Sequence, residues 1–196
     1  MLILVRHGRT AVNAGTRLQG RMDEPLDELG ARQAAATGEW VRSRWNVSEI
    51  VSSPLVRAFD TACAIGGNVR VDPSFIELDY GDWDGLPLAD VPRAEWARWR
   101  SDPTFRPPNG ETLVELDERV APALDMLLDR ARSEDIVVVS HVSPIKSAVT
   151  KVLGAGPEMT WRMSLDRASI CTVSVGPNGP ALSSFNETGH LRDLRG

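Results

Sequence analysis

The chain has too few cysteines and too short apolar runs for several classes of protein. Only Cys63 and Cys171 occur among its 196 residues, which excludes a disulfide framework and the spacing of a zinc site. Both cysteines lie in apolar stretches, so we expect them to be buried free thiols. No apolar run approaches the ~20 residues of a transmembrane helix. The first run ends at Arg6 and is too short for a signal peptide, so we expect a cytoplasmic protein.

An excess of positive charge is also absent. The formal net charge is −5, which argues against a partner such as nucleic acid or an anionic membrane surface. The two lysines are Lys146 and Lys151, and the arginines are scattered along the chain. We interpret the arginines as a compositional preference and not as one extended anion-binding surface. With 42% hydrophobic and 25% charged residues, residues 1–196 have the composition of a single globular domain.

Apolar runs alternate with amphipathic stretches along most of the chain. We predict strands at 2–6, 49–52, 69–72 and 136–140, and further β-like runs at 168–175 and 181–185. Helices are predicted between these runs, at about 29–45, 54–65 and 144–153 and from the capping box of Thr112 and Glu115 onward. This alternation predicts an α/β fold, a three-layer α/β/α sandwich with a mostly parallel central sheet.

Three segments carry local signals of their own. Residues 9–26 are predicted to form a long polar loop. Ser53 and Pro54 are typical of an N-cap and a first helical residue, so we place a helix start there. Residues 80–110 are rich in glycine, proline and tryptophan and predict a short cap with a helix near 93–100.

Two predicted strands end in histidine. Arg6 and His7 follow the first strand, and His141 follows the strand at 136–140. Ligands bind at the carboxyl ends of strands in an α/β sheet, and Arg57 falls close to the end of another strand. Guanidinium groups bind phosphate oxygens bidentately, and imidazole is a donor or a nucleophile near neutral pH. We therefore predict a site for a phosphoryl group in which arginines supply the positive charge, without a metal.

At these residues the sequence resembles the histidine phosphatase superfamily, which has the phosphoglycerate mutase-like fold. The resemblance extends over about residues 1–190 in ordered blocks. These blocks are Arg6-His7-Gly8-Arg9-Thr10 with Asn13, Leu18-Gln19-Gly20, Ser52-Ser53-Pro54 with Arg57, Glu77 with Gly81, Trp83 and Gly85, Gly110-Glu111-Thr112, and Val139-Ser140-His141. Residues 142–146 resemble an actinobacterial branch that includes α-ribazole phosphatase-like members.

The resemblance implies a role for each matching residue. His7 is the nucleophile that becomes a phosphohistidine, and Arg6, Arg57 and His141 bind the phosphoryl oxygens. Glu77 is the general acid and then the general base, and it must be protonated when the substrate arrives. The spacing of four residues to Gly81 favours Glu77 over the nearby Asp79, Asp82 and Asp84. Further substrate or phosphate contacts are expected from Asn13, Thr10, Gln19 and Gly20, and no cofactor is expected.

Two positions depart from the family pattern. Arg9 stands where glutamate or glutamine is common, and it either adds charge at the mouth of the pocket or points to solvent. Val142 stands where glycine is common, and a glycine there lets the backbone approach the phosphate closely.

Three functions remain open. The family includes phosphatases, cofactor-dependent phosphoglycerate mutases and proteins that bind phosphate without catalysis. The interval 78–110 is compact, whereas mutases of the family tend to carry an insertion there, so we favour hydrolysis of a small phosphorylated metabolite. Trp83, Trp96 and Trp99 either pack the cap or stack on the leaving group. The sequence does not select a substrate, and a homodimer is compatible with it without being indicated by any motif.

Overall fold

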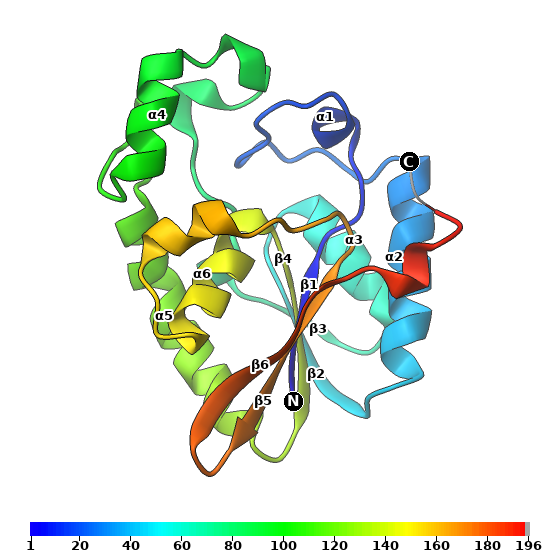
Figure 1. The fold of residues 1–196 in the computed structure, drawn as a ribbon. Coiled ribbons are helices and arrows are strands. Elements are labelled where there is room, and N and C mark those ends of the chain that lie inside the picture. The colour runs from blue at the N-terminus through cyan, green and yellow to red at the C-terminus, as the bar shows by residue number, and fades with distance from the viewer. Residues whose placement is uncertain (195–196) are drawn as a thin grey trace.

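The computed structural model describes residues 1–194, which are built around a six-stranded sheet with the order β3-β2-β4-β1-β5-β6 (Figure 1). The strands are β1 (Leu2–Arg6), β2 (Val47–Ser52), β3 (Val69–Val71), β4 (Asp135–Ser140), β5 (Ile170–Gly176) and β6 (Gly179–Glu187). β1 to β4 are joined in parallel, and β5 and β6 add an antiparallel hairpin beside β1. The predicted mostly parallel sheet is confirmed.

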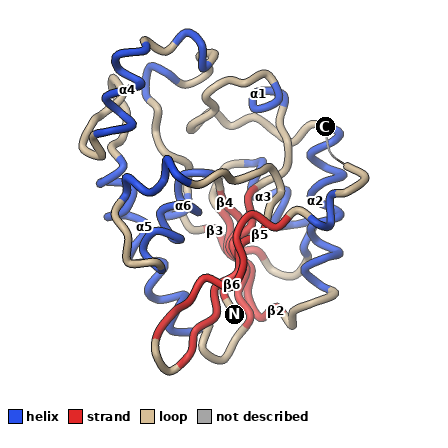
Figure 2. The backbone as a smooth tube through the Cα atoms, in the orientation of Figure 1, coloured by secondary structure: helices blue, strands red, loops and turns tan. Residues whose placement is uncertain are grey.

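Helices cover both faces of the sheet (Figures 1 and 2). The helices of the two covering layers are α2 (Glu28–Arg42), α3 (Val56–Ile65), α5 (Leu113–Arg130) and α6 (Val142–Val152). Alternate residues of β1 face opposite layers, as the period of two in a strand requires. Leu2 and Leu4 belong to the core beneath α5 and α6, and Ile3 and Val5 belong to the core beneath α2 and α3. The three-layer sandwich is therefore confirmed.

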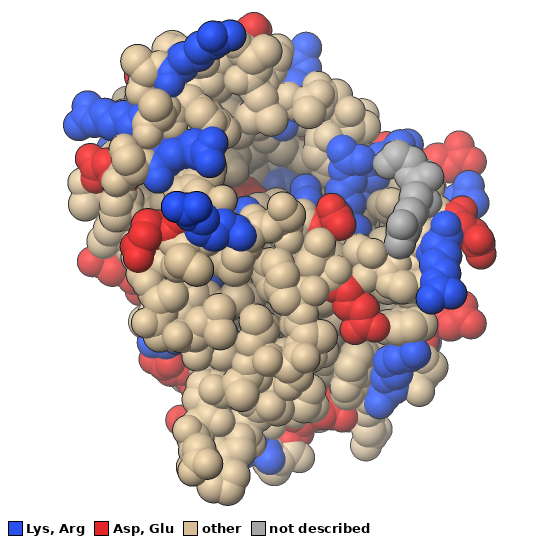
Figure 3. Space-filling view, viewed as in Figure 1, with Lys and Arg blue, Asp and Glu red and all other residues tan. Residues whose placement is uncertain are grey.

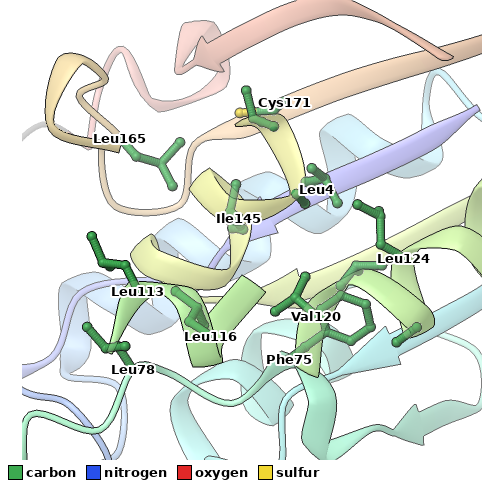
Figure 4. Close-up of a cluster of buried hydrophobic side chains, with 14 of the residues drawn as sticks. Leu4, Phe75, Leu78, Leu113, Leu116, Val120, Leu124, Ile145, Leu165 and Cys171 are labelled. Carbon is green, nitrogen blue, oxygen red and sulfur yellow. The ribbon is translucent and has the colours of Figure 1, made fainter. Parts of the chain in front are cut away.

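The larger core joins the sheet to α5 and α6 (Figure 4). Leu4 of β1 lies with Val120 and Leu124 of α5 and Ile145 of α6 in this cluster, and all four side chains are buried. The capping box predicted at Thr112 and Glu115 is present, because Thr112 Oγ1 accepts from the Glu115 N–H and the Glu115 carboxylate accepts from the Thr112 N–H. This core holds β1 and β4 rigidly behind their carboxyl ends.

Two segments lie beyond the carboxyl end of the parallel strands (Figure 1). One carries α1 (Ala11–Ala14), and the other carries α4 (Arg93–Ser101). The predicted helix near 93–100 is thus confirmed. Trp99 of α4 packs edge-on against Trp83, with ring centroids 5.7 Å apart, and against Trp161, at 5.0 Å. Trp83 and Trp99 are buried, so their rings pack the interior of the segment that carries α4. We call this segment, residues 80–110, the α4 lobe.

Three local predictions differ from the structure. The polar loop contains the helical turn α1, which Thr10 caps. α3 begins at Val56 and not at Pro54, because the backbone of Leu55 is extended and Asp23 accepts from the Val56 N–H at 2.7 Å. α6 begins two residues before the predicted start.

Cys63 is exposed, whereas Cys171 is buried as predicted. The buried face of α3 is formed by Ala58, Thr61, Ala62 and Ile65, which leaves Cys63 on the opposite face. Within residues 1–194, no helix has the length and apolar content to span a membrane.

Candidate active site

The two predicted histidines lie side by side at the carboxyl edge of the sheet. β1 pairs with β4 in a register that sets Arg6 opposite Ser140, so the next residue of each strand follows at the same level. The ring centroids of His7 and His141 are 5.0 Å apart. Both rings are buried, with exposed fractions of 3% and 0%. The topology of the sheet therefore brings together two histidines that are more than 130 residues apart in the sequence.

The hydrogen bonds of His7 define its tautomer. Nδ1 lies 2.7 Å from the carbonyl oxygen of Gly8. A carbonyl oxygen only accepts, so Nδ1 carries the proton and the lone pair is on Nε2. Burial, together with the positive charges of Arg57 and Arg6, holds the pKa of His7 well below its ordinary value. The ring is therefore neutral near neutral pH, with Nε2 free of a proton, which is the form a nucleophile needs.

Arg57 is held rigidly beside that nitrogen. Its Nε donates to His7 Nε2 at 3.2 Å, and its Nη1 and Nη2 donate to the carbonyl oxygens of Met22 and Gly20 at 2.6 and 2.7 Å. The side chain is 1% exposed, and burial lowers its pKa. Gly20 adopts a φ of +45°, a conformation that side chains disfavour. Gly20 thus contributes its carbonyl oxygen and its backbone shape to the site.

The side chain of Arg6 is fixed by one backbone contact. Its Nη1 donates to the carbonyl oxygen of Leu165 at 2.5 Å, while its buried Nε has no partner. Burial lowers the pKa of Arg6 to about 10, which leaves the guanidinium charged near neutral pH.

Ser53, which the sequence predicts to be a helix N-cap, contacts His141, and Leu55 occupies the N-cap position of α3. Nε2 of His141 lies 2.7 Å from Ser53 Oγ, and Nδ1 is buried without a partner. Burial and the charge of Arg57 hold the pKa of His141 well below its ordinary value, so this ring too is neutral.

The loop after His7 presents two amide side chains. Thr10 Oγ1 donates to Gln19 Oε1 at 2.8 Å, and the Thr10 N–H donates to Asn13 Oδ1 at 3.2 Å. These bonds engage the amide oxygens and leave Asn13 Nδ2 and Gln19 Nε2 buried without partners. Thr10 is fully buried and its hydroxyl is used within the loop, so it orients Asn13 and Gln19.

Four residues of the predicted phosphate site thus carry a buried side-chain nitrogen without a hydrogen-bond partner. They are Arg6 Nε, Asn13 Nδ2, Gln19 Nε2 and His141 Nδ1. Buried donors in folded proteins are normally paired, so a group of unpaired donors requires an explanation. An anion with several acceptor oxygens would satisfy them. Figure 3 shows the surface hollowed between the lobe of α4 and the segment of α1, with basic side chains beside the hollow.

Glu77 faces the start of α6. Its Oε1 accepts from the N–H groups of Leu78 and Ser143 at 2.8 and 3.1 Å, and its Oε2 accepts from the N–H of Val142 at 3.2 Å. The side chain is 6% exposed. Val142 and Ser143 are the first residues of α6, so the start of this helix fixes the position of the Glu77 carboxyl group. The contact with Val142 uses only its backbone N–H. Valine at this position therefore keeps the contact that a glycine would make.

Other charged residues arrange the surroundings. Glu111 binds Arg119 at 2.6 Å and Arg21 at 3.3 Å, and it accepts from the Asp79 N–H. Arg9 forms an ion pair with Asp27 at 2.8 Å, which directs its charge to the start of α2. The sequence reading missed Arg21 and Ser53, whose roles depend on partners far away in the chain. Residues 1–194 contain no group of three or more His, Cys, Asp or Glu placed to hold a metal ion.

Known proteins share this fold. A solved mycobacterial glucosyl-3-phosphoglycerate phosphatase in complex with VO3 is 34% identical, with a TM-score of 0.85 over 95% of this chain and 98% of that chain. A mutant phosphoserine phosphatase from Entamoeba histolytica, solved in complex with phosphoserine, is 29% identical, with a TM-score of 0.87 over 97% of this chain and 98% of that chain.

A bifunctional protein from Mycobacterium tuberculosis is 34% identical over 198 residues, a match that covers 97% of this chain. The chain spans about half the length, 54%, of that relative. The family model of the histidine phosphatase superfamily (branch 1) matches residues 2–188. With this match and the shared fold, the chain belongs to the histidine phosphatase superfamily, branch 1.

Proposed function

We propose that the chain hydrolyses phosphate monoesters through a phosphohistidine on Nε2 of His7. The observation that carries the proposal is the set of three unpaired buried donors, together with the unpaired Nδ1 of His141, around a neutral imidazole whose Nε2 is unprotonated. A phosphoryl group offers several acceptor oxygens together with an electrophilic phosphorus atom. The solved relatives named above are phosphatases, which supports the same reaction class for this chain.

In the first step, Nε2 of His7 attacks phosphorus in line with the ester oxygen. The phosphorus–oxygen bond breaks as the phosphorus–nitrogen bond forms, and Glu77 gives its proton to the leaving oxygen. Arg6, Arg57 and His141 bind the phosphoryl oxygens, whose charge they stabilise in the transition state. Asn13 and Gln19 add their amide donors. The Nδ1–H bond to Gly8 stabilises the positive charge that the ring acquires.

In the second step, the Glu77 carboxylate takes a proton from water, which attacks the phosphohistidine. The phosphorus–nitrogen bond breaks, and inorganic phosphate leaves with the ring restored to its neutral form. Glu77 ends the cycle protonated and ready for the next substrate. All the charge stabilisation in this scheme comes from side chains and from the Gly8 carbonyl, so it requires no metal and no cofactor.

We further propose that residues 1–196 act as one domain in which residues 80–110 form the cap over the substrate. The substrate class is a small phosphorylated metabolite, such as the phosphoserine and glucosyl-3-phosphoglycerate of the named relatives. The chain matches about half of the bifunctional mycobacterial relative. We therefore propose for this chain only an activity that belongs to the matching part of that protein.

The test is release of p-nitrophenolate from p-nitrophenyl phosphate in excess EDTA, by the wild type and by His7→Ala. We expect turnover by the wild type and none by the variant. If the wild type fails with this substrate and instead isomerises 3-phosphoglycerate in the presence of its bisphosphate, the chain is a mutase. Phosphate binding without either reaction would make it a non-catalytic member of the fold.

A further inference from the structure

Trp83 and Asp84 are consecutive residues that face two different parts of the molecule. Trp83 is buried in the aromatic cluster of the α4 lobe, where its ring stacks on Phe105 with centroids 5.9 Å apart. Asp84 lies instead against the loop that follows α1, and its carboxylate contacts the backbone of Gly20 and Arg21. These two consecutive residues therefore contact the α4 lobe and the loop after α1, respectively.

The contact between Asp84 and that loop is tight. Oδ2 accepts from the Arg21 N–H at 3.0 Å. Oδ1 is buried without a hydrogen-bond partner, and it lies where a Cβ on Gly20 would come within 1.7 Å. Only glycine leaves room for the carboxylate at this point, so the position of Asp84 and the conformation of Gly20 depend on each other.

The same short segment holds Arg57. The carbonyl oxygens of Gly20 and Met22 accept from Nη2 and Nη1 of Arg57, and Arg21, the residue that Asp84 holds, lies between them. Nε of Arg57 in turn donates to Nε2 of His7. A continuous series of contacts therefore runs from Asp84 through residues 20–22 to Arg57 and the nucleophile.

Further bonds tie the two segments together on both sides of this contact. The Gly85 N–H donates to the Leu18 carbonyl at 2.7 Å, and the Leu18 N–H donates to the Leu86 carbonyl at 2.9 Å. The Leu88 N–H donates to the Thr16 carbonyl at 3.1 Å. Residues 84–88 and 16–21 thus form a short paired strip. The Asp84 carboxylate anchors it at the backbone of Arg21, whereas Asp79 and Glu111 bind the Arg21 side chain.

We propose that Asp84 is a positioning residue that fixes the guanidinium of Arg57 for phosphate binding through residues 20–22. This inference rests on the proposed function, because it takes Arg57 to bind the phosphoryl group. Removal of the carboxylate frees the Arg21 N–H and loosens Gly20, so the two carbonyl acceptors of Arg57 no longer fix the guanidinium. Phosphate binding then weakens although no group that touches phosphate has changed.

The experiment measures the dissociation constant of inorganic phosphate by calorimetry for the wild type, Asp84→Ala, Asp84→Asn, Arg57→Ala and the double variant Asp84→Ala/Arg57→Ala. Asp82→Ala is the matched control, because Asp82 lies two residues away in the same turn and binds only the Asn109 side chain with its carboxylate. Circular dichroism shows which variants fold.

We expect Asp84→Ala to weaken phosphate binding about tenfold and Asp82→Ala to leave it unchanged. Asp84→Asn keeps an acceptor for the Arg21 N–H and restores most of the affinity. In the Arg57→Ala background, Asp84→Ala has little further effect, because the two residues act in series.

Affinity within twofold of wild type for Asp84→Ala, or full additivity of the two substitutions, would overturn the proposal. If Asp84→Ala does not fold, failure of Asp84→Asn to retain wild-type affinity would overturn it instead. Should Arg57→Ala itself bind phosphate normally, the proposed function fails first, and the two failures are thereby distinguished.

Discussion

Nε of Arg57 lies 3.2 Å from Nε2 of His7, so the lone pair of the candidate nucleophile faces a guanidinium. In the protein without substrate, this contact keeps Nε2 of His7 unprotonated. It also places positive charge where the phosphoryl oxygens would arrive. Substrate binding must break the contact, and the same donor can then turn to the phosphoryl group. One pair of residues therefore governs both the resting state and the proposed reaction.

Arg57→Lys should reduce kcat/KM by about a hundredfold or more, because a single ammonium cannot hold both carbonyl oxygens and the phosphoryl group. It also leaves at least one of the Gly20 and Met22 carbonyls unsatisfied, which costs about 1–3 kcal/mol of unfolding free energy. Steady-state kinetics and urea denaturation measure the two effects. Wild-type kinetics in the lysine variant would show that Arg57 has no part in catalysis.

The two buried imidazoles should remain neutral in mildly acidic solution. Burial and neighbouring arginines hold the pKa values of His7 and His141 well below their ordinary range. As the pH falls below about 6.5, the unfolded chain takes up protons that the folded chain does not, so the unfolding free energy decreases. Nuclear magnetic resonance titration of the ring signals checks this prediction. Titration of either ring near pH ~6.5 would contradict it.

Asp84 should make stability depend on pH in the opposite sense. Burial raises its pKa to about 6 in the folded chain, above the ~3.9 of an exposed aspartate. The folded chain therefore binds the proton more tightly, and this contribution to stability is present below pH ~4 and lost as the pH rises to about 6. Relative to Asp84→Asn, the wild type should lose stability over that interval in urea denaturation series. A constant difference between the two proteins would show that Asp84 titrates normally.

Gly30→Ala should destabilise the chain and disturb the loop after His7. A Cβ on Gly30 would lie 1.9 Å from the Arg9 carbonyl oxygen, a backbone atom that cannot move alone. We expect a loss of about 1–3 kcal/mol of unfolding free energy, together with weaker phosphate binding. Gly176→Ala is the control, since a Cβ there meets nothing within 4 Å. Equal stability of the two variants would refute the close approach of α2 to the loop.

The sequence predicted the parts of the site that depend on strand order. His7 and His141 meet because both follow apolar strands, and parallel strands end at one edge. Arg57 was placed close to a strand end for the same reason. The family spacing selected Glu77, whose three backbone donors come from its own neighbour and from the start of α6.

The remaining features arise from contacts between distant segments. Nothing near Val56 in the sequence announces that Asp23 caps it, and nothing near Ser53 announces that its hydroxyl contacts His141. The exposure of Cys63 depends on which face of α3 meets the sheet. Such contacts follow from the packing of the whole chain, so local propensity does not contain them.

The most direct test of the account is to trap the phosphoenzyme. Glu77→Gln should still be phosphorylated by p-nitrophenyl phosphate, whose leaving group needs no acid, but it should lose the base that activates water. Rapid mixing should then give a burst of about one p-nitrophenolate per chain, and peptide mass spectrometry should find an acid-labile phosphoryl group on His7. A variant that shows no burst and carries no phosphoryl group on His7, while the wild type turns over, would contradict the phosphohistidine mechanism.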